Sequence, residues 1–179
     1  MSKKILKADF VFEYVIRDVN LLYWNKRIAA MKKGKKMERY KVILVDDEAE
    51  VIDMIEKKIH WNDLGFEVAG SATNGVKALE LVEKLQPDVV LTDIKMPYMD
   101  GLELSRRLNR EYPNIYIMLC TGFDEFEYAK EAVHLEIKEY MLKPVNATEL
   151  SESLTNLKHT LDREREEKLN VKKLNDYFQ

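Results

Sequence analysis

From Tyr40 onward, short runs rich in β-branched and aromatic residues alternate with longer amphipathic segments. The runs predict five strands, at Tyr40–Val45, Phe66–Gly70, Asp88–Leu91, Ile115–Cys120 and Glu139–Leu142. The segments between them repeat apolar residues at three-to-four spacing. They predict helices at Glu48–His60, Gly75–Leu85, Gly101–Glu111 and Glu125–Leu135, and a longer helix after Asn146. This alternation predicts a parallel sheet with helices on both faces, a doubly wound α/β domain over about residues 38–160.

Four of the expected helices begin with an aspartate or asparagine followed three positions later by glutamate. These pairs are Asp47/Glu50, Asp100/Glu103, Asp124/Glu127 and Asn146/Glu149. The spacing is that of an N-terminal capping box, so it marks where each helix starts.

Polar residues with distinctive chemistry follow the ends of four strands. Asp46 and Asp47 follow the first, Asp93 the third, Thr121 the fourth and Lys143 the fifth. The carboxyl ends of parallel strands share one edge of the sheet, so these side chains should converge. Three carboxylates repel one another unless a cation relieves them, and oxygen ligands alone favour a hard metal such as Mg²⁺. Together with a lysine and a hydroxyl, such a metal can hold a phosphoryl group, and Asp93 would then be a nucleophile that forms an aspartyl phosphate.

This arrangement resembles the receiver domain of two-component response regulators, over Tyr40 to about Arg163. The resemblance implies a flavodoxin-like (βα)5 doubly wound parallel sheet with strand order 2-1-3-4-5. Other details, such as Ile59-His60-Trp61 and Gly65-Phe66, resemble the subfamily with an AraC-type DNA-binding domain. The main motifs are Asp46-Asp47, Asp93 followed by Met96-Pro97-Tyr98-Met99-Asp100-Gly101, Thr121-Gly122, and Lys143-Pro144 with Tyr140 three residues before Lys143.

The resemblance implies a phosphoacceptor site and not an ordinary enzyme. Asp93 would accept a phosphoryl group from a sensor histidine kinase, and the domain would catalyse only its own phosphorylation and dephosphorylation. Asp46, Asp47 and Asp93 would hold Mg²⁺ together with the backbone carbonyl of Lys95. Lys143 would pair with the phosphoryl oxygens.

The resemblance also implies a two-state switch in which Thr121 and Tyr140 move together. The movement would reshape the face formed by the fourth helix, the fifth strand and the fifth helix, and the phosphorylated chain would form a homodimer through that face. The output would be transcription, through a DNA-binding domain that the 16 residues after Arg163 are too few to form. The alternative is a stand-alone receiver that relays phosphate or binds a protein without touching DNA.

Two rival enzyme classes are excluded by spacing. A haloacid-dehalogenase-type phosphatase needs a second acid two residues after its nucleophile, and Lys95 stands there. A dinucleotide-binding domain needs a glycine-rich turn after the first strand, where this chain has Asp46-Asp47-Glu48.

Charge is divided unevenly along the 179 residues. Residues 1–36 hold ten Lys or Arg against three Asp or Glu, a net charge of +7, which leaves −10 for the rest of a total of −3. The main body therefore lacks the basic character of a nucleic-acid-binding domain, and we expect this chain itself to bind no nucleic acid. Residues 1–37 are an unassigned extension. Either they come from an upstream start, or their alternating apolar and basic residues form a surface-binding helix.

The remaining composition indicates a cytoplasmic protein. No uncharged apolar stretch approaches the length of a membrane span. The single cysteine, Cys120, lies in an apolar strand-like run, so it is expected to be a buried structural residue in a reducing compartment.

The last segment, residues 161–179, is predicted as a helical linker or the start of a coiled coil. Leu150, Leu154, Leu157 and Leu161 follow a four-three-four step, and a fully charged stretch, 163–168, comes next. Two interpretations stay open: a solvated helix, or a dimerising linker toward a downstream effector.

Overall fold

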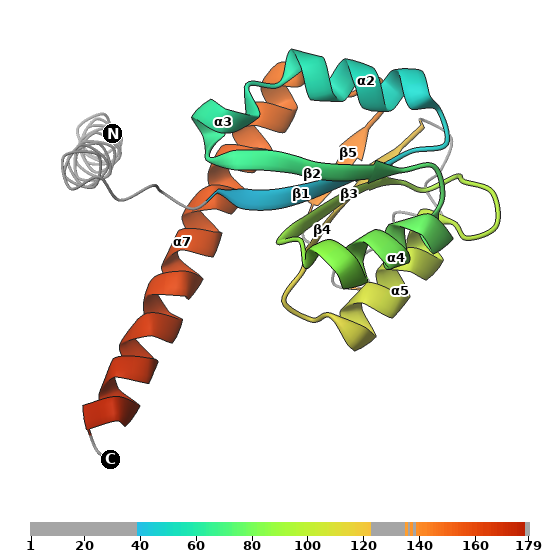
Figure 1. Cartoon of the computed structure of the whole chain (residues 1–179). Coiled ribbons are helices and arrows are strands. Elements are labelled where there is room, and N and C mark those ends of the chain that lie inside the picture. Colours follow the sequence, from blue (N-terminus) through green and yellow to red (C-terminus); the bar gives the residue numbers. More distant parts are fainter. Residues whose placement is uncertain (1–38, 123–134, 136, 138, 178–179) are drawn as a thin grey trace, which may run out of the picture. The chain divides into compact units, whose positions relative to one another are not determined.

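A five-stranded parallel sheet forms the centre of the fold (Figure 1). The computed structural model describes residues 39–122, 135, 137 and 139–177. The spatial order is β2-β1-β3-β4-β5, and each neighbouring pair is parallel, which confirms the predicted fold class. The strands are β1 (Tyr40–Val45), β2 (Phe66–Ala72), β3 (Val89–Asp93), β4 (Tyr116–Thr121) and β5 (Glu139–Leu142).

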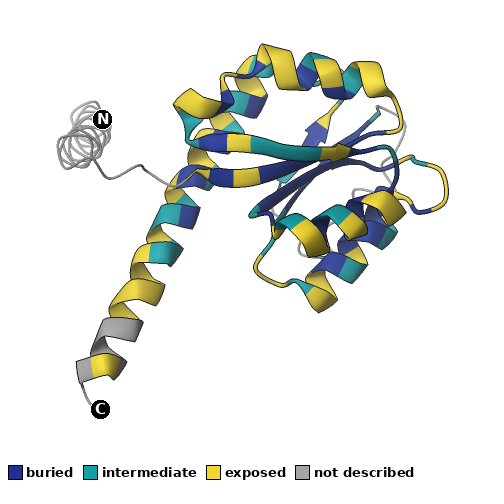
Figure 2. Cartoon of the chain, in the orientation of Figure 1, coloured by how far each residue is buried: buried dark blue, intermediate teal, exposed yellow. Residues whose placement is uncertain are grey.

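Helices cover both faces of the sheet (Figure 1). One face packs against α2 (Ala49–Lys58), α3 (Trp61–Leu64) and α7 (Ala147–Tyr177), and the other packs against α4 (Gly75–Leu85) and α5 (Gly101–Glu111). All five residues of β3 are buried, as expected of a strand that is covered on both sides (Figure 2). The helix expected at 125–135 lies almost entirely outside the described residues.

Side-chain caps fix the starts of three helices. Asp100 accepts a hydrogen bond from the Glu103 backbone N–H at 2.7 Å, and Asn146 accepts one from the Thr148 N–H at 2.8 Å, so both predicted caps are confirmed. Asn74 caps α4. The predicted start of this helix at Gly75 is confirmed, but its cap was not predicted because no glutamate follows Asn74 at the third position. The predicted cap Asp124 lies outside the described residues.

The first predicted helix, Glu48–His60, is wrong at both ends. Its N-cap is Glu48 and not Asp47, and no side chain caps it. The helix stops at Lys58, and a separate short helix, α3, follows, which ends at Gly65 with φ of +85°. The break lets Trp61 turn inward until it is only 7% exposed, so tertiary packing overrides a continuous helical pattern.

The leucine stripe at the start of α7 belongs to the core of the domain. Leu150, Leu154 and Leu161 are buried against the sheet, and Leu157 packs beside them partly buried. The four-three-four spacing that suggested a coiled coil is therefore used within the chain, as in any amphipathic helix that packs on a sheet. These leucines are not available to a partner helix.

Replacing Leu154 by Ala is expected to lower the free energy of unfolding by about 2–5 kcal/mol, because it leaves a cavity in a core position that is 1% exposed. The matched control, Leu169→Ala at a position 51% exposed on the same helix, should change it by about 0.5 kcal/mol or less. Urea unfolding followed by circular dichroism measures both. Similar small changes in the two variants would contradict the core assignment.

Polar contacts hold the middle of α7 to the amino-terminal edge of the sheet. The Tyr40 hydroxyl donates to Asp162 at 2.9 Å, and the Lys158 ammonium donates to the same carboxylate at 2.6 Å. The Tyr116 hydroxyl donates to Glu164; burial, followed by that bond and charge, raises the pKa of Tyr116 to about 12. The helix thus crosses residue 160 without a break and stays attached to the sheet beyond it.

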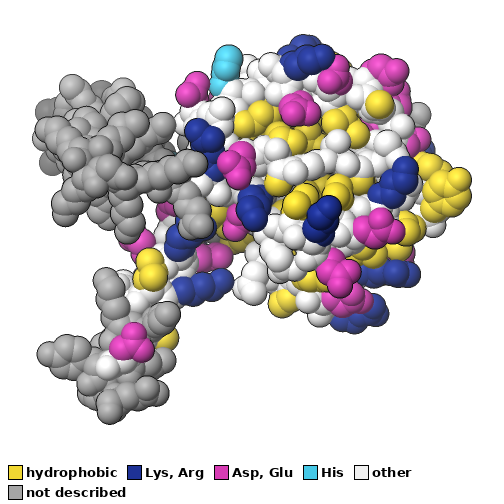
Figure 3. All heavy atoms as spheres, in the orientation of Figure 1, with side chains coloured by type: hydrophobic (Ala, Val, Ile, Leu, Met, Phe, Trp, Pro, Cys, Tyr) yellow, Lys and Arg dark blue, Asp and Glu magenta, His cyan; other side chains and the backbone are white. Residues whose placement is uncertain are grey.

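The surface has a mixed charge. Acidic and basic side chains are interspersed over the face seen in Figure 3. Within the described part of the chain, no helix has both the length and the apolar character to cross a membrane.

Candidate functional site

Strand register brings the predicted site residues to one edge of the sheet. Val45 at the end of β1 pairs with Thr92, so Asp46 follows beside Asp93. On the other side of β3, Asp93 pairs with Cys120 of β4. Thr121 pairs with Leu142 of β5, the residue before Lys143. The predicted convergence at the carboxyl edge is therefore observed.

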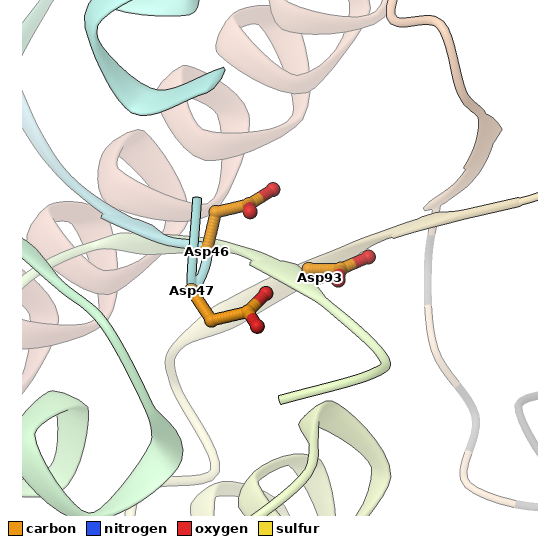
Figure 4. Close-up of side chains that lie close together, drawn as sticks. All are labelled: Asp46, Asp47 and Asp93. Carbon is orange, nitrogen blue, oxygen red and sulfur yellow. The ribbon is translucent and has the colours of Figure 1, made fainter. Parts of the chain in front are cut away.

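Three carboxylates form the centre of this edge. Oxygen atoms of Asp46, Asp47 and Asp93 all lie within 4.8 Å of one another. Asp46 and Asp93 are buried, at 5% and 7% exposure, whereas Asp47 is exposed. Figure 4 shows all three side chains pointing to the same side of the strand ends. One oxygen of Asp46 also accepts the Glu48 backbone N–H at 3.0 Å, which orients that carboxylate.

Lys143 supplies a positive charge to this group. Its ammonium lies 2.8 Å from Asp46 and 3.1 Å from Asp93. Burial lowers the pKa of Lys143, but the hydrogen bonds and charges of the two carboxylates outweigh burial and raise it overall. Lys143 therefore remains protonated at neutral pH.

The environment of Asp93 disfavours its ionised form. Burial raises its pKa, and Asp46 raises it further, while Lys143 and the Ile94 backbone N–H oppose them; the net pKa is above the usual value. One lysine among three carboxylates leaves an excess of negative charge in a partly buried site. An all-oxygen ligand set of this kind fits a hard divalent cation.

The other predicted site residues surround this centre. Thr121 is fully buried at the end of β4, and its carbonyl accepts the Lys143 backbone N–H at 2.7 Å. Tyr140 is half-buried on β5, packed on the core face that α4 and α5 cover. Lys95 has an exposed side chain in the loop after β3. The Lys143–Pro144 peptide bond is cis.

Cys120 is a structural residue, as expected. It is 3% exposed, and burial raises the pKa of its thiol to about 12. A protonated, buried thiol is a poor nucleophile, so Cys120 has no part in the chemistry of the neighbouring site.

Gly101 has a structural role that was not predicted from the sequence. The backbone of α5 approaches β3 so closely that a Cβ at Gly101 would lie 2.1 Å from the Asp93 carbonyl oxygen and 3.0 Å from the Ile94 Cα. The Gly101 N–H donates to the Ile94 carbonyl at 2.8 Å. Glycine is required here for close approach, and it fixes the backbone of Asp93. A glycine directly after the Asp100 cap was the available signal.

Gly101→Ala is therefore expected to lower the free energy of unfolding by about 1–3 kcal/mol, because the added methyl group would clash with the backbone of β3, which cannot move aside. Gly122→Ala is the matched control, since a Cβ there meets none of the described residues within 4 Å, and its effect should be about 1 kcal/mol or less. Thermal unfolding of both variants tests this difference. Equal stability of the two would mean that α5 and β3 are not in close contact at this position.

Comparison with known proteins places this site in a family. The family model of the response regulator receiver domain matches residues 42–155. The uncharacterized transcriptional regulatory protein YesN of Bacillus subtilis (strain 168) is 42% identical over 125 residues, which cover 70% of this chain and 34% of YesN. The transcriptional regulatory protein HptR of Staphylococcus aureus (strain NCTC 8325 / PS 47) is 34% identical over 122 residues, 68% of this chain and 48% of HptR.

A solved structure agrees with these relatives. The REC domain of AraT, a response regulator from Geobacillus stearothermophilus, matches with a TM-score of 0.67 and 39% identity, over 70% of this chain and 98% of that domain. The chain spans less than half of the length of the two curated relatives. With its fold, its acidic cluster and these matches, the chain belongs to the family of response regulator receiver domains.

Proposed function

We propose that this receiver domain accepts a phosphoryl group on Asp93 from a sensor histidine kinase. The observation that carries the proposal is the position of Asp93, a buried carboxylate among two further acids with the Lys143 ammonium at 3.1 Å. Burial of such a group is costly for folding, which is expected where a side chain is kept for its chemistry.

The reaction follows from the groups at this edge. A carboxylate oxygen of Asp93 forms a bond to phosphorus as the bond between phosphorus and the donor's imidazole nitrogen breaks. The electron pair of that bond leaves with the nitrogen. Lys143 lies close enough to Asp93 to stabilise the negative charge of the transferred oxygens.

The acidic cluster supports Mg²⁺ as the cofactor. We assign its ligands to Asp46, Asp47 and Asp93, with the Lys95 backbone carbonyl as the fourth protein group. A divalent ion bound there would offset the charge of the carboxylates and of the incoming phosphoryl group. In the proposed switch, Thr121 and Tyr140 respond to phosphorylation and alter the surface around β5, through which two phosphorylated chains associate.

We further propose that the domain acts in the cytoplasm and controls transcription. The support is that YesN and HptR are both named as transcriptional regulatory proteins and are longer than the matched region. A stand-alone receiver that works without DNA is the alternative. The coding sequence after Gln179 distinguishes them, because a DNA-binding domain in the same reading frame would favour the first.

Intact mass spectrometry tests the phosphoacceptor proposal. The chain is incubated with phosphoramidate or acetyl phosphate, with Mg²⁺ or with a chelator. We expect the mass of one added phosphoryl group only when Mg²⁺ is present. No added mass in a chain whose circular dichroism is intact would count against the proposal.

A further inference from the structure

Exposed apolar side chains lie on three separate segments at the edge of the sheet that carries the site. Five large apolar residues of the described chain are well exposed, and two of them lie on the far part of α7. The other three are Val76 at the start of α4, Tyr98 after β3, and Leu142 directly before Lys143. Each belongs to a segment at the carboxyl edge. We call these three side chains the apolar rim of the site.

Tyr98 is the most exposed of them, at 92%. The loop that carries it protrudes from the domain at the right of Figure 1, and hydrophobic side chains form the outer edge of the surface at the same place in Figure 3. A solvated aromatic ring contributes almost nothing to folding, because it buries no apolar area in the chain.

The backbone conformation at Tyr98 is strained. Tyr98 has φ of +69°, a left-handed conformation that is unfavourable for a bulky residue. The loop is nevertheless fixed on both sides of it. The Met99 N–H donates to the Pro97 carbonyl at 2.8 Å, the Gly75 N–H donates to the Met99 carbonyl at 3.1 Å, and the Met99 side chain is buried. The ring therefore projects from a pre-ordered loop, which lowers the entropy lost when a partner binds it.

We propose that Tyr98 anchors the surface on which the phosphohistidine-bearing donor protein docks. This inference rests on the proposed function, and it names the partner surface of the same site. Asp93 is only 7% exposed at the centre of the rim, so a donor histidine has to enter from this edge. The protein around that histidine then covers the loop after β3. Tyrosine is among the residues that most often dominate binding energy at such interfaces.

The test compares a protein donor with a small one. The protein donor is the autophosphorylated core of the host's sensor kinase that transfers fastest to the unchanged chain, and the small donor is phosphoramidate. Tyr98→Ala should lower kcat/KM for transfer from the kinase by about 10-fold or more, because the ring is lost. Phosphorylation by phosphoramidate should stay within about twofold, since the ring does not reach the reacting atoms.

Three further variants separate the loss of the aromatic ring from an effect on the backbone. Tyr98→Asn also removes the ring but tolerates the left-handed backbone, so it should behave like Tyr98→Ala. Tyr98→Phe keeps the ring and should retain transfer. Val171→Ala, at an exposed apolar position on α7, should change neither reaction.

Unchanged transfer from the kinase in Tyr98→Ala and Tyr98→Asn would overturn the inference. An equal loss with both donors would also overturn it, because the loop would then act on the site itself. Weaker self-association, measured by sedimentation, with normal transfer would assign the rim to a second copy of the chain instead. If the unchanged chain accepts phosphate from neither donor, the proposed function fails and the docking inference fails with it.

Discussion

Asp93→Asn is expected to abolish phosphorylation by phosphoramidate and by a kinase. Asparagine has nearly the same shape as aspartate, but its amide is not a nucleophile toward phosphorus. Asp46 and Asp47 keep their carboxylates in this variant, so a phosphoryl group that still appears would be bound to one of them or to another side chain. Intact mass measured over a time course with Mg²⁺ gives the result directly.

The matched control for this prediction is Asp53→Asn, at an exposed position on α2 where the carboxylate pairs with exposed Lys57. It should be phosphorylated at the rate of the unchanged chain. Phosphorylation of Asp93→Asn to the same extent as the control would contradict the assignment of Asp93.

Asp93→Asn should also have a free energy of unfolding that is equal to or higher than that of the unchanged chain at pH 7 without Mg²⁺. The folded-state pKa of Asp93 is raised, mainly by burial, so its contribution to stability is favourable at low pH. That contribution is lost as the pH rises through the folded-state pKa, and the ionised group then opposes folding. A neutral amide avoids this cost, although it gives up the ionic bond to Lys143. Urea unfolding at pH 7 measures the balance.

Lys143→Met is expected to slow phosphorylation by phosphoramidate about 100-fold or more. The Lys143 ammonium contacts both Asp46 and Asp93, and loss of one such group from a reacting centre has effects of this size. The variant also removes the side chain that lowers the pKa of Asp93, leaving the Ile94 backbone N–H, so that pKa rises further. The remaining activity should therefore shift toward higher pH, where more Asp93 is ionised.

Lys77→Met serves as the control, because this lysine of α4 is exposed and its ammonium donates to the Thr73 hydroxyl at 3.2 Å and not to a carboxylate of the site. Its phosphorylation rate and pH profile should match those of the unchanged chain. A Lys143→Met rate within a few fold of the control would mean that the charge of Lys143 is not needed for transfer.

Much of the architecture could be predicted because it depends on short-range patterns. Strands covered on both faces carry apolar runs, as Val89-Val90-Leu91 does in β3, and Asp100 and Asn146 start helices through hydrogen bonds to residues nearby in the chain. The convergence of Asp46, Asp93 and Lys143 followed from topology alone, since parallel strands end at one edge.

The features that could not be predicted depend on contacts between distant segments. The helix break before Trp61 and the inward-facing stripe of Leu150 and Leu154 are decided by the surfaces they meet. A four-three-four spacing is the same for a helix that packs on a sheet and for one that packs on another helix. The need for glycine at 101 arises from its distance to Asp93, which the sequence does not encode locally.

The most direct test of the central claim is to locate the phosphoryl group. The chain is phosphorylated with phosphoramidate and Mg²⁺, treated with borohydride, which reduces an acyl phosphate to an alcohol, and digested for peptide mass analysis. The account predicts homoserine at position 93, with Asp46 and Asp47 unchanged. Homoserine at position 46 or 47, or phosphate on another side chain, would contradict it.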